Sequence, residues 1–296
     1  MLVNEYISTR DSRLMDGLIP VVEIMSKVEQ SRESKIEIDF SHIQFISPLF
    51  VLSLIVYFAG SGKEISCINL ADEFNLIRFD TGGLKPDLMR RSEFLALMEG
   101  YARKPYIPIV NFPARAQSDD KDVISSVIEN IIIRQLNISP NVSMGLKYMV
   151  EETLDNITEH SGSDRGFIYA QAHPEKGYLD LCIADCGVSL LGSYRRLQGN
   201  EIVSDLEAIK AANRGISSKN LPDAENRGYG IRTSKRMLIE GLGGQYLMLS
   251  GGCFYLKTPD FDSFYSLPDG LRWNGTMVAF RIPYNVDKFN YINFIE

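Results

Sequence analysis

The chain has 296 residues and a formal net charge of -7; 45% of its residues are hydrophobic, 23% charged and 10% aromatic. This length exceeds that of a typical single domain and predicts two compact units. The composition is that of a soluble globular protein. The acidic balance argues against a nucleic-acid partner, because phosphate neutralisation requires a basic surface.

Two features bear on the cellular setting. The N-terminus lacks a basic segment followed by an apolar core and a cleavage site, so no secretory signal is expected. The most apolar stretch, residues 45–60, is shorter than the roughly 20 residues that span a bilayer. We therefore predict a buried helix there and no membrane partner. The four cysteines lack the spacing of a zinc site and are interpreted as reduced thiols of a cytoplasmic protein.

The first hundred residues predict a small α/β unit. A helix interrupted or kinked near Pro20 leads to a buried strand at 36–43. A helix that begins at Pro48 and a second strand at 64–70 follow. This alternation of strands and helices indicates a parallel or mixed sheet.

A segment that contains three prolines and ends in a charged run, residues 103–122, predicts a domain boundary. We therefore expect one domain at 1–105 and a second at 106–296. The second domain is predicted to contain, in order, a strand within 107–114, helices at about 120–136 and 140–160, two strands joined by a turn within 166–185, a helical piece at 204–213, a helix closed by glycine within 228–244, and strands within 245–257 and 275–283.

Glu152 and Asn156 lie four residues apart on the predicted helix and therefore share a face. Asn156 offers a hard oxygen ligand for Mg²⁺, and Glu152 is placed to orient or deprotonate an attacking hydroxyl or water. The alternative reading of such a pair is a solvated helix face.

Three later segments complete a pattern. Asp185 ends an apolar strand and can accept the exocyclic N–H of adenine, and Gly187 leaves room for close approach of the base. The segment NRGYGI, residues 226–231, opens a helix and presents backbone N–H groups to phosphates. NGT, residues 274–276, opens the last strand. Each segment alone is typical of a turn or loop; together they predict a nucleotide site.

These segments resemble the four conserved boxes of the GHKL ATPase superfamily over about residues 108–285. The resemblance implies a Bergerat α/β sandwich that binds ATP and Mg²⁺, with Glu152 as the catalytic carboxylate and Asn156 as the metal ligand. The closing segments resemble the ATPase domain of histidine kinases and anti-sigma-factor serine kinases. The residues that it implies for nucleotide binding are Asn156, Asp185, Gly187, Ser189, Arg227, Gly228, Tyr229, Gly230, Ile231 and Thr276.

Two details follow from the resemblance. Ser189 stands where the family has Gly or Ala, so the pattern departs there but keeps a small residue. His160 follows the first box as in the serine kinases and is expected to make a local or lid contact. The stretch 188–227 is expected to form the ATP lid, with basic residues Arg195, Arg196, Arg214, Lys219 and Arg227 that can reach the γ-phosphate or form a solvated surface.

The N-terminal half resembles a STAS domain, the fold of anti-sigma-factor antagonists. In that fold a strand leads to a loop with a phosphorylated serine and then to a helix. Here the phosphoacceptor position falls on Pro48, while Ser47 is one residue early and Phe50 replaces the usual glycine. Ser47 is therefore read either as a phosphoacceptor or as a plain helix N-cap.

The resemblance implies a cytoplasmic serine/threonine kinase that transfers the γ-phosphate of ATP to a protein hydroxyl. Its partner would be a STAS-type antagonist or a sigma-like regulator, and a homodimer is compatible with the family. The alternative is an ATP-gated binding switch or slow ATPase. A histidine kinase is disfavoured because His42 lies in a predicted strand and the other two histidines lie within the ATPase region.

Overall fold

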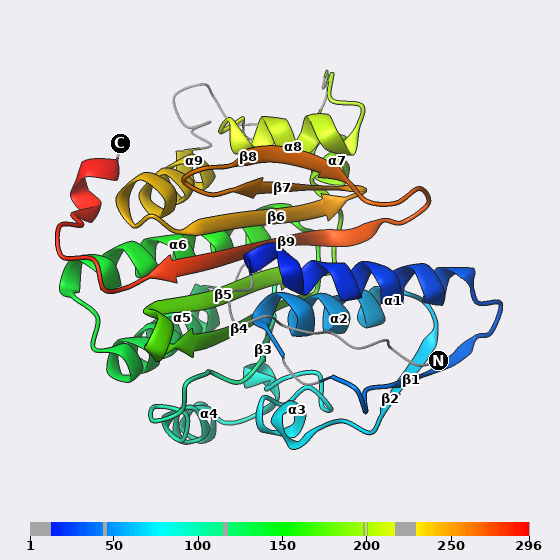
Figure 1. The fold of residues 1–296 in the computed structure, drawn as a ribbon, viewed down its shortest axis with the longest axis horizontal. Coiled ribbons are helices and arrows are strands. Elements are labelled where there is room, and N and C mark those ends of the chain that lie inside the picture. The colour runs from blue at the N-terminus through cyan, green and yellow to red at the C-terminus, as the bar shows by residue number, and fades with distance from the viewer. Residues whose placement is uncertain are drawn as a thin grey trace.

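The fold is an α/β arrangement built on one large sheet (Figure 1). The computed structural model describes residues 13–43, 46–114, 118–197, 199, 201–216 and 229–295. The seven-stranded sheet has the order β3-β4-β5-β9-β6-β7-β8, and every neighbouring pair is antiparallel. Its strands are β3 (Val110–Pro113), β4 (Arg165–His173), β5 (Tyr178–Asp185), β6 (Gln245–Gly251), β7 (Cys253–Lys257), β8 (Asp262–Ser266) and β9 (Trp273–Pro283).

The N-terminal half supplies a strand–helix–strand unit. Strands β1 (Lys35–Asp39) and β2 (Glu64–Ile68) pair in parallel, and α2 (Pro48–Gly60) connects them. The remaining helices are α1 (Leu18–Gln30), α3 (Asp72–Leu76), α4 (Arg91–Glu99), α5 (Ser118–Leu136), α6 (Pro140–His160), α7 (Leu190–Tyr194), α8 (Asp205–Asn213) and α9 (Tyr229–Arg236). A π-helical turn at Met237–Gly241 continues α9, and 3-10 turns occupy Leu14–Gly17, Pro86–Leu88, Pro174–Lys176 and Tyr291–Phe294.

Helix α6 begins and ends where the sequence predicts. Ser139 precedes it in an extended conformation and accepts the Val142 N–H, while Pro140 occupies the first helical position. Proline suits that position because the N–H that it lacks would have no partner inside the helix. The apolar face of α6 is buried against the sheet.

The two faces of the sheet carry two separate apolar cores. Helices α5, α6 and α9 cover one face, and α1 and α2 cover the other (Figure 1). Alternate residues of the same strands divide between the cores, so that Leu181 and Ile183 face α6 while Cys182 and Ala184 face α2. This alternation is the consequence of the two-residue period of a strand.

Helix α2 is buried nearly all around, which its apolar sequence explains. Its core contains strand residues from beyond position 105, among them Tyr169, Met277 and Ala279. At its C-terminal end the Gly60 carbonyl accepts the Asn274 side chain at 3.2 Å. The described residues on the two sides of position 105 therefore share one core, and the division into a STAS-like and a GHKL-like domain stays a prediction.

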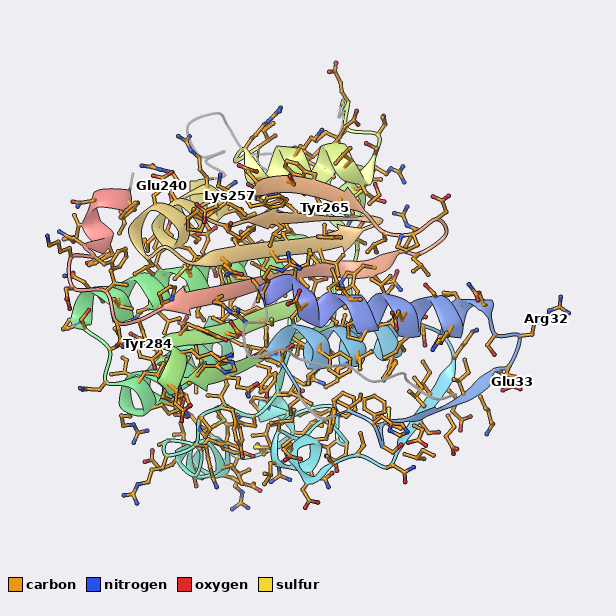
Figure 2. The ribbon with its side chains drawn as sticks, in the orientation of Figure 1. Arg32, Glu33, Glu240, Lys257, Tyr265 and Tyr284 are labelled. Atoms are coloured by element: carbon orange, nitrogen blue, oxygen red, sulfur yellow. The ribbon has the colours of Figure 1, made fainter. Side chains whose placement is uncertain are left out.

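Some local predictions were wrong. Pro20 lies in the first turn of α1, where it does not interrupt the helix, and β1 ends at Asp39. The sequence reading also missed β8, the outer partner of β7. Tyr265 of β8, which Figure 2 labels, lies in the outer part of the sheet. Its ring stacks on that of Phe254 of β7, with ring centroids 4.8 Å apart.

Two expectations concern the chain as a whole. Within the described ranges, no helix is long and apolar enough to cross a membrane. All four cysteines are free thiols, and Cys182 and Cys253 are buried in strands.

Candidate functional site

A pocket lies between α6, the segment after β5 and the α6-facing side of the sheet. It gathers residues from four of the predicted segments, which are more than 120 positions apart at their extremes. The predicted site residues that line it are Glu152, Asn156, Asp185, Ser189, Ile231 and Thr276. Gly230 lies directly beside Glu152, Tyr229 begins α9, and Arg227 and Gly228 fall outside the described residues.

Asp185 is the most buried charged group of the pocket, with 2% of its surface exposed. Its Oδ1 atom accepts the Gly187 N–H at 2.8 Å, and its Oδ2 atom accepts the Thr276 N–H at 3.2 Å. Burial raises the pKa of this carboxyl to about 7, because desolvation outweighs the two backbone hydrogen bonds. The raised pKa means that the Asp185 carboxyl keeps its proton to a higher pH than an exposed aspartate does.

Residues 274–276, which we call the strap, close over the end of β5. Gly275 adopts a φ of +84°, and a Cβ there would lie 2.2 Å from the Asp185 carbonyl oxygen. Glycine is thus required both by the left-handed backbone and by the close approach. Thr276 then follows with its N–H directed at the Asp185 carboxylate.

Gly187 and Gly230 each lie so close to another part of the chain that a side chain would not fit. A Cβ on Gly187 would lie 2.3 Å from the Ser161 carbonyl oxygen, so the segment after β5 packs directly on the end of α6. A Cβ on Gly230 would lie 1.7 Å from the carboxylate of Glu152. The absent side chains thus make room for Ser161 and Glu152, a reason that sequence reasoning did not supply.

Glu152 and Asn156 interact with each other along α6. The Asn156 amide nitrogen donates to the Glu152 carbonyl at 2.8 Å and to its carboxylate at 3.2 Å. With Nδ2 used in this way, Oδ1 is the atom of Asn156 that remains to meet a ligand in the pocket.

The sequence predicts a Mg²⁺ site at Asn156, and the Oδ1 atom is the donor that the structure leaves for it. The described residues contain no cluster of three or more His, Cys, Asp or Glu side chains that would enclose a metal ion. Mg²⁺ does not need such a cage, since it is usually bound by one or two oxygen ligands together with waters and substrate phosphates. The Asn156 Oδ1 atom is an oxygen donor of that kind, and its role as a Mg²⁺ ligand stays a prediction.

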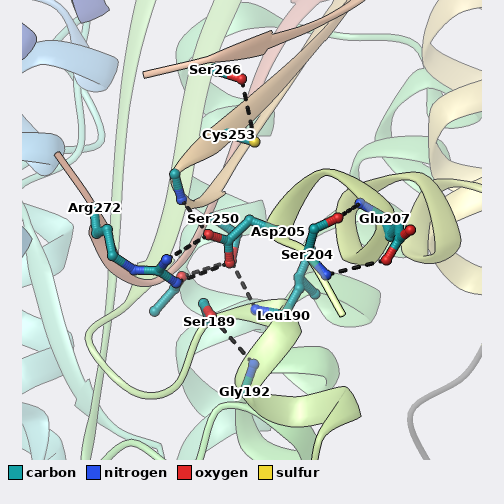
Figure 3. Close-up of polar contacts among 12 residues, drawn as sticks. Ser189, Leu190, Gly192, Ser204, Asp205, Glu207, Ser250, Cys253, Ser266 and Arg272 are labelled. Carbon is teal, nitrogen blue, oxygen red and sulfur yellow. Dashed lines mark hydrogen bonds and ion pairs between the residues drawn. The ribbon is translucent and has the colours of Figure 1, made fainter. Parts of the chain in front are cut away.

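The first part of the predicted lid is a docked cap. Helix α7 packs against β6, and α8 packs against β6 and β7. Asp205 accepts the Gly252 N–H at 3.0 Å and pairs with Arg272 at 2.9 Å (Figure 3). A Cβ on Gly251 would lie 2.2 Å from the Asp205 carboxylate, so the turn after β6 fits closely around that group. The cap, residues 189–213, is therefore fixed to the sheet at α8.

Three of the five predicted basic lid residues, Arg195, Arg196 and Arg214, fall within the described residues. Arg195 and Arg214 end α7 and α8 and are exposed. The guanidinium of Arg196 lies against Gly162, where an added Cβ would come within 2.5 Å of it. Lys219 and Arg227 lie outside the described residues.

Three predicted residues have identifiable local roles. Ser189 is the N-cap of α7 and accepts the Gly192 N–H at 3.3 Å (Figure 3). His160 is the last residue of α6 and lines the pocket. Ser47 caps α2 by accepting the Phe50 N–H, which agrees with the N-cap reading; its modification stays untested.

Sequence reasoning missed the floor of the pocket. Tyr246 and Met248 of β6 and Val278 and Phe280 of β9 lie beneath it. On each strand these residues are two positions apart and therefore lie on the same face of the sheet. That alternation is the sequence feature that could have identified them as facing α6. No residue of this floor was singled out because apolar strand residues are ordinary core.

No family model matches this sequence, and no curated protein matches it either.

Proposed function

We propose that this chain binds Mg-ATP in the pocket between α6 and the sheet. The observation that supports this most is Asp185, a buried carboxylate that lines the pocket and is held by two backbone N–H groups. Within the described ranges no ion pair reaches it. A buried acceptor without a cation suits a neutral donor, such as the exocyclic amine of adenine.

The opposite wall supplies groups for the phosphates. Asn156 offers Oδ1 to the metal, and Mg²⁺ supplies neutralisation of the phosphate charge when bound. Glu152 orients or deprotonates the attacking hydroxyl or water. Gly230, in the first turn of α9, brings the N-terminal end of that helix against Glu152, where backbone N–H groups favour anions.

The reaction we propose is transfer of the γ-phosphate to a protein hydroxyl, as the resemblance to anti-sigma-factor serine kinases implies. Glu152 accepts the proton of the attacking hydroxyl, and the leaving group is ADP. The partner would be a STAS-type antagonist or a sigma-like regulator.

The alternative is an ATP-gated binding switch, and one observation favours it. Helix α2 contacts the strap, where the Gly60 carbonyl accepts the Asn274 amide, and also the residue after the strap, where the Ser53 hydroxyl lies 3.6 Å from the Met277 sulfur. A ligand that moves the strap therefore moves the surface on which the N-terminal half rests.

Calorimetric titration with Mg-ATP and Mg-ADP tests the site in the full chain. Asn156→Ala should weaken Mg-ATP binding at least about tenfold, the loss expected from one metal ligand. Asn130→Ala, on the exposed face of α5, is the matched control and should bind as the wild type does.

Labelled ATP then separates the activities. Label on an added protein favours the kinase, label released as phosphate favours an ATPase, and binding without turnover favours the switch. Absence of any binding by the wild type would refute the proposed function.

A further inference from the structure

Ser250 of β6 lies behind the strap and makes three polar contacts, although only 1% of its surface is exposed. Its Oγ atom lies 2.9 Å from the Gly275 carbonyl oxygen and 3.1 Å from the Thr276 hydroxyl oxygen. It also accepts the Leu190 N–H at 2.9 Å (Figure 3). Ser250 therefore joins the strap to Leu190, the first residue of α7 in the cap.

The hydrogen count fixes the direction of these bonds. A serine hydroxyl has one hydrogen and two acceptor lone pairs, and a carbonyl or a backbone N–H can act in one sense only. The Ser250 hydrogen goes to the Gly275 carbonyl, and one lone pair takes the Leu190 N–H. The remaining lone pair can pair with Thr276 only if the Thr276 hydroxyl donates.

The direction of the Thr276 hydroxyl determines what it presents to the pocket. Both Thr276 and Asp185 line that pocket. With its hydrogen directed at Ser250, the Thr276 oxygen has only lone pairs left for a ligand. Its backbone N–H is already used on Asp185. This end of the pocket therefore presents acceptors and no donor from these two residues.

We propose that Ser250 is a positioning residue that sets base selectivity: by orienting the Thr276 hydroxyl, it makes the pocket select a purine with an exocyclic amino group over one with a carbonyl at that position. This inference rests on the proposed nucleotide site and names its base class. An amino group donates to the acceptors, whereas a carbonyl oxygen faces lone pairs and is left without a donor. A site built to bond one of these groups rejects the other strongly, because its buried polar atoms are left unpaired.

ATP and inosine triphosphate are the probes, because they differ at this position of the base: the amino group of one is a carbonyl in the other. Titrations of the full chain run at about pH 8.5, above the pKa of about 7 of Asp185. The wild type should prefer ATP by at least about 100-fold. Ser250→Ala frees the Thr276 hydroxyl to turn and donate, and the preference should fall about tenfold.

Two further variants separate positioning from damage to the fold. Ser53→Ala removes another buried hydroxyl behind β9, beside Met277, and should keep the full preference. Thr276→Val removes the oriented hydroxyl with little change in shape, and adding Ser250→Ala to it should not alter the ratio further.

The ratio of the two affinities is the readout that a merely structural role would not move. If Ser250→Ala lowers both affinities equally and keeps the ratio, or if the wild type binds both nucleotides alike, the inference is wrong while the proposed nucleotide site stands. If the wild type binds neither triphosphate, the proposed function fails and the inference fails with it.

Discussion

Strand β5 carries two buried aspartates whose surroundings differ sharply. Asp180 and Asp185 are each 2% exposed. Asp180 receives two hydrogen bonds from the Arg281 guanidinium, at 2.7 and 2.8 Å, and His173 lies 3.6 Å away. Among the described residues, the hydrogen-bond partners of Asp185 are the backbone N–H groups of Gly187 and Thr276. The pKa values respond in opposite directions: burial raises that of Asp185 to about 7, whereas Arg281 holds that of Asp180 below its ordinary value despite burial.

The comparison sets a carboxylate that is neutralised within the fold against one that lines a pocket, and we propose the second as the ligand-binding group. Asp180 has its charge neutralised within the fold, so it has little to offer a ligand. Asp185 keeps an unneutralised acceptor at the wall of a pocket. A buried acid with a raised pKa in a cleft is a candidate functional group for this reason.

The largest expected effect comes from removing the partner that Asp180 has and Asp185 lacks. Arg281→Met should lower the free energy of unfolding by about 3–5 kcal/mol, because it removes the guanidinium that neutralises the buried Asp180 carboxylate. Urea denaturation measures this. The matched control is Arg272→Met, whose side chain is 59% exposed beside Asp205; it should cost at most about 1 kcal/mol. Equal losses would contradict the structural role of the Arg281 pair.

The second prediction concerns ATP binding, for which Asp185 should matter and Asp180 should not. Asp185→Asn should weaken ATP binding about 100-fold or more, because the amide presents a donor where the base also donates. Asp180→Asn is the matched change on the same strand and should alter the ATP affinity of the folded protein less than about threefold. Calorimetry gives both values. Similar losses in the two variants would remove the distinction between the aspartates.

The third prediction concerns pH. Asp185 accepts from the base best when ionised, so ATP affinity should rise up to about tenfold per pH unit below pH 7 and then level off. Titration in buffers of different ionisation enthalpy should also detect proton release on binding at pH 6 to 7. An affinity that does not change between about pH 6 and pH 8 would contradict the raised pKa.

The same two carboxyls should act on stability in opposite senses. The folded pKa of Asp185 lies above its unfolded value, so its contribution favours the fold at low pH and is lost as the pH rises through about 7. The folded pKa of Asp180 is lowered, so its contribution is present above the unfolded pKa and is lost as the pH falls. Unfolding of Asp185→Asn and Asp180→Asn across pH isolates each contribution.

The smallest expected effect tests whether the cap controls how fast ATP leaves the part of the pocket beside Asp185. Asp205→Asn weakens the attachment of α8 to the turn after β6 and should speed ATP dissociation about three- to tenfold with a smaller change in affinity. Glu207→Gln alters the capping box at the start of the same helix without touching the sheet, and serves as control. Stopped-flow displacement of a fluorescent nucleotide measures both rates.

Local signals predicted the elements around the site well. Ser139 with Pro140 marks the start of α6, and the turn at 174–177 separates β4 from β5. These are contacts between near neighbours, so a short stretch of sequence contains their whole physical cause. The strand β8 was missed because DSFYS is short and carries a weak alternation.

Contacts between distant segments were not predictable in the same way. The sequence does not say that α2 lies behind the strap, that Gly230 makes room for Glu152, or that Asp205 attaches the cap to the sheet. Each depends on which face of the sheet a helix covers, and one sequence leaves that choice open. The role of Ser250 was not predictable for the same reason, since its partners come from two other parts of the chain, Leu190 and the strap.

The burial of α2 has a consequence for how the chain reaches its fold. Ten residues of α2, Pro48 to Tyr57, are buried, and much of their cover comes from β4, β5 and β9, more than 100 positions later. During synthesis at about 5–20 residues per second, this apolar helix emerges seconds before the strands that shield it. Its contacts are strongly non-local, which slows folding and leaves the helix prone to aggregation in the interval. Expression of this protein should therefore depend on chaperones that hold nascent apolar helices.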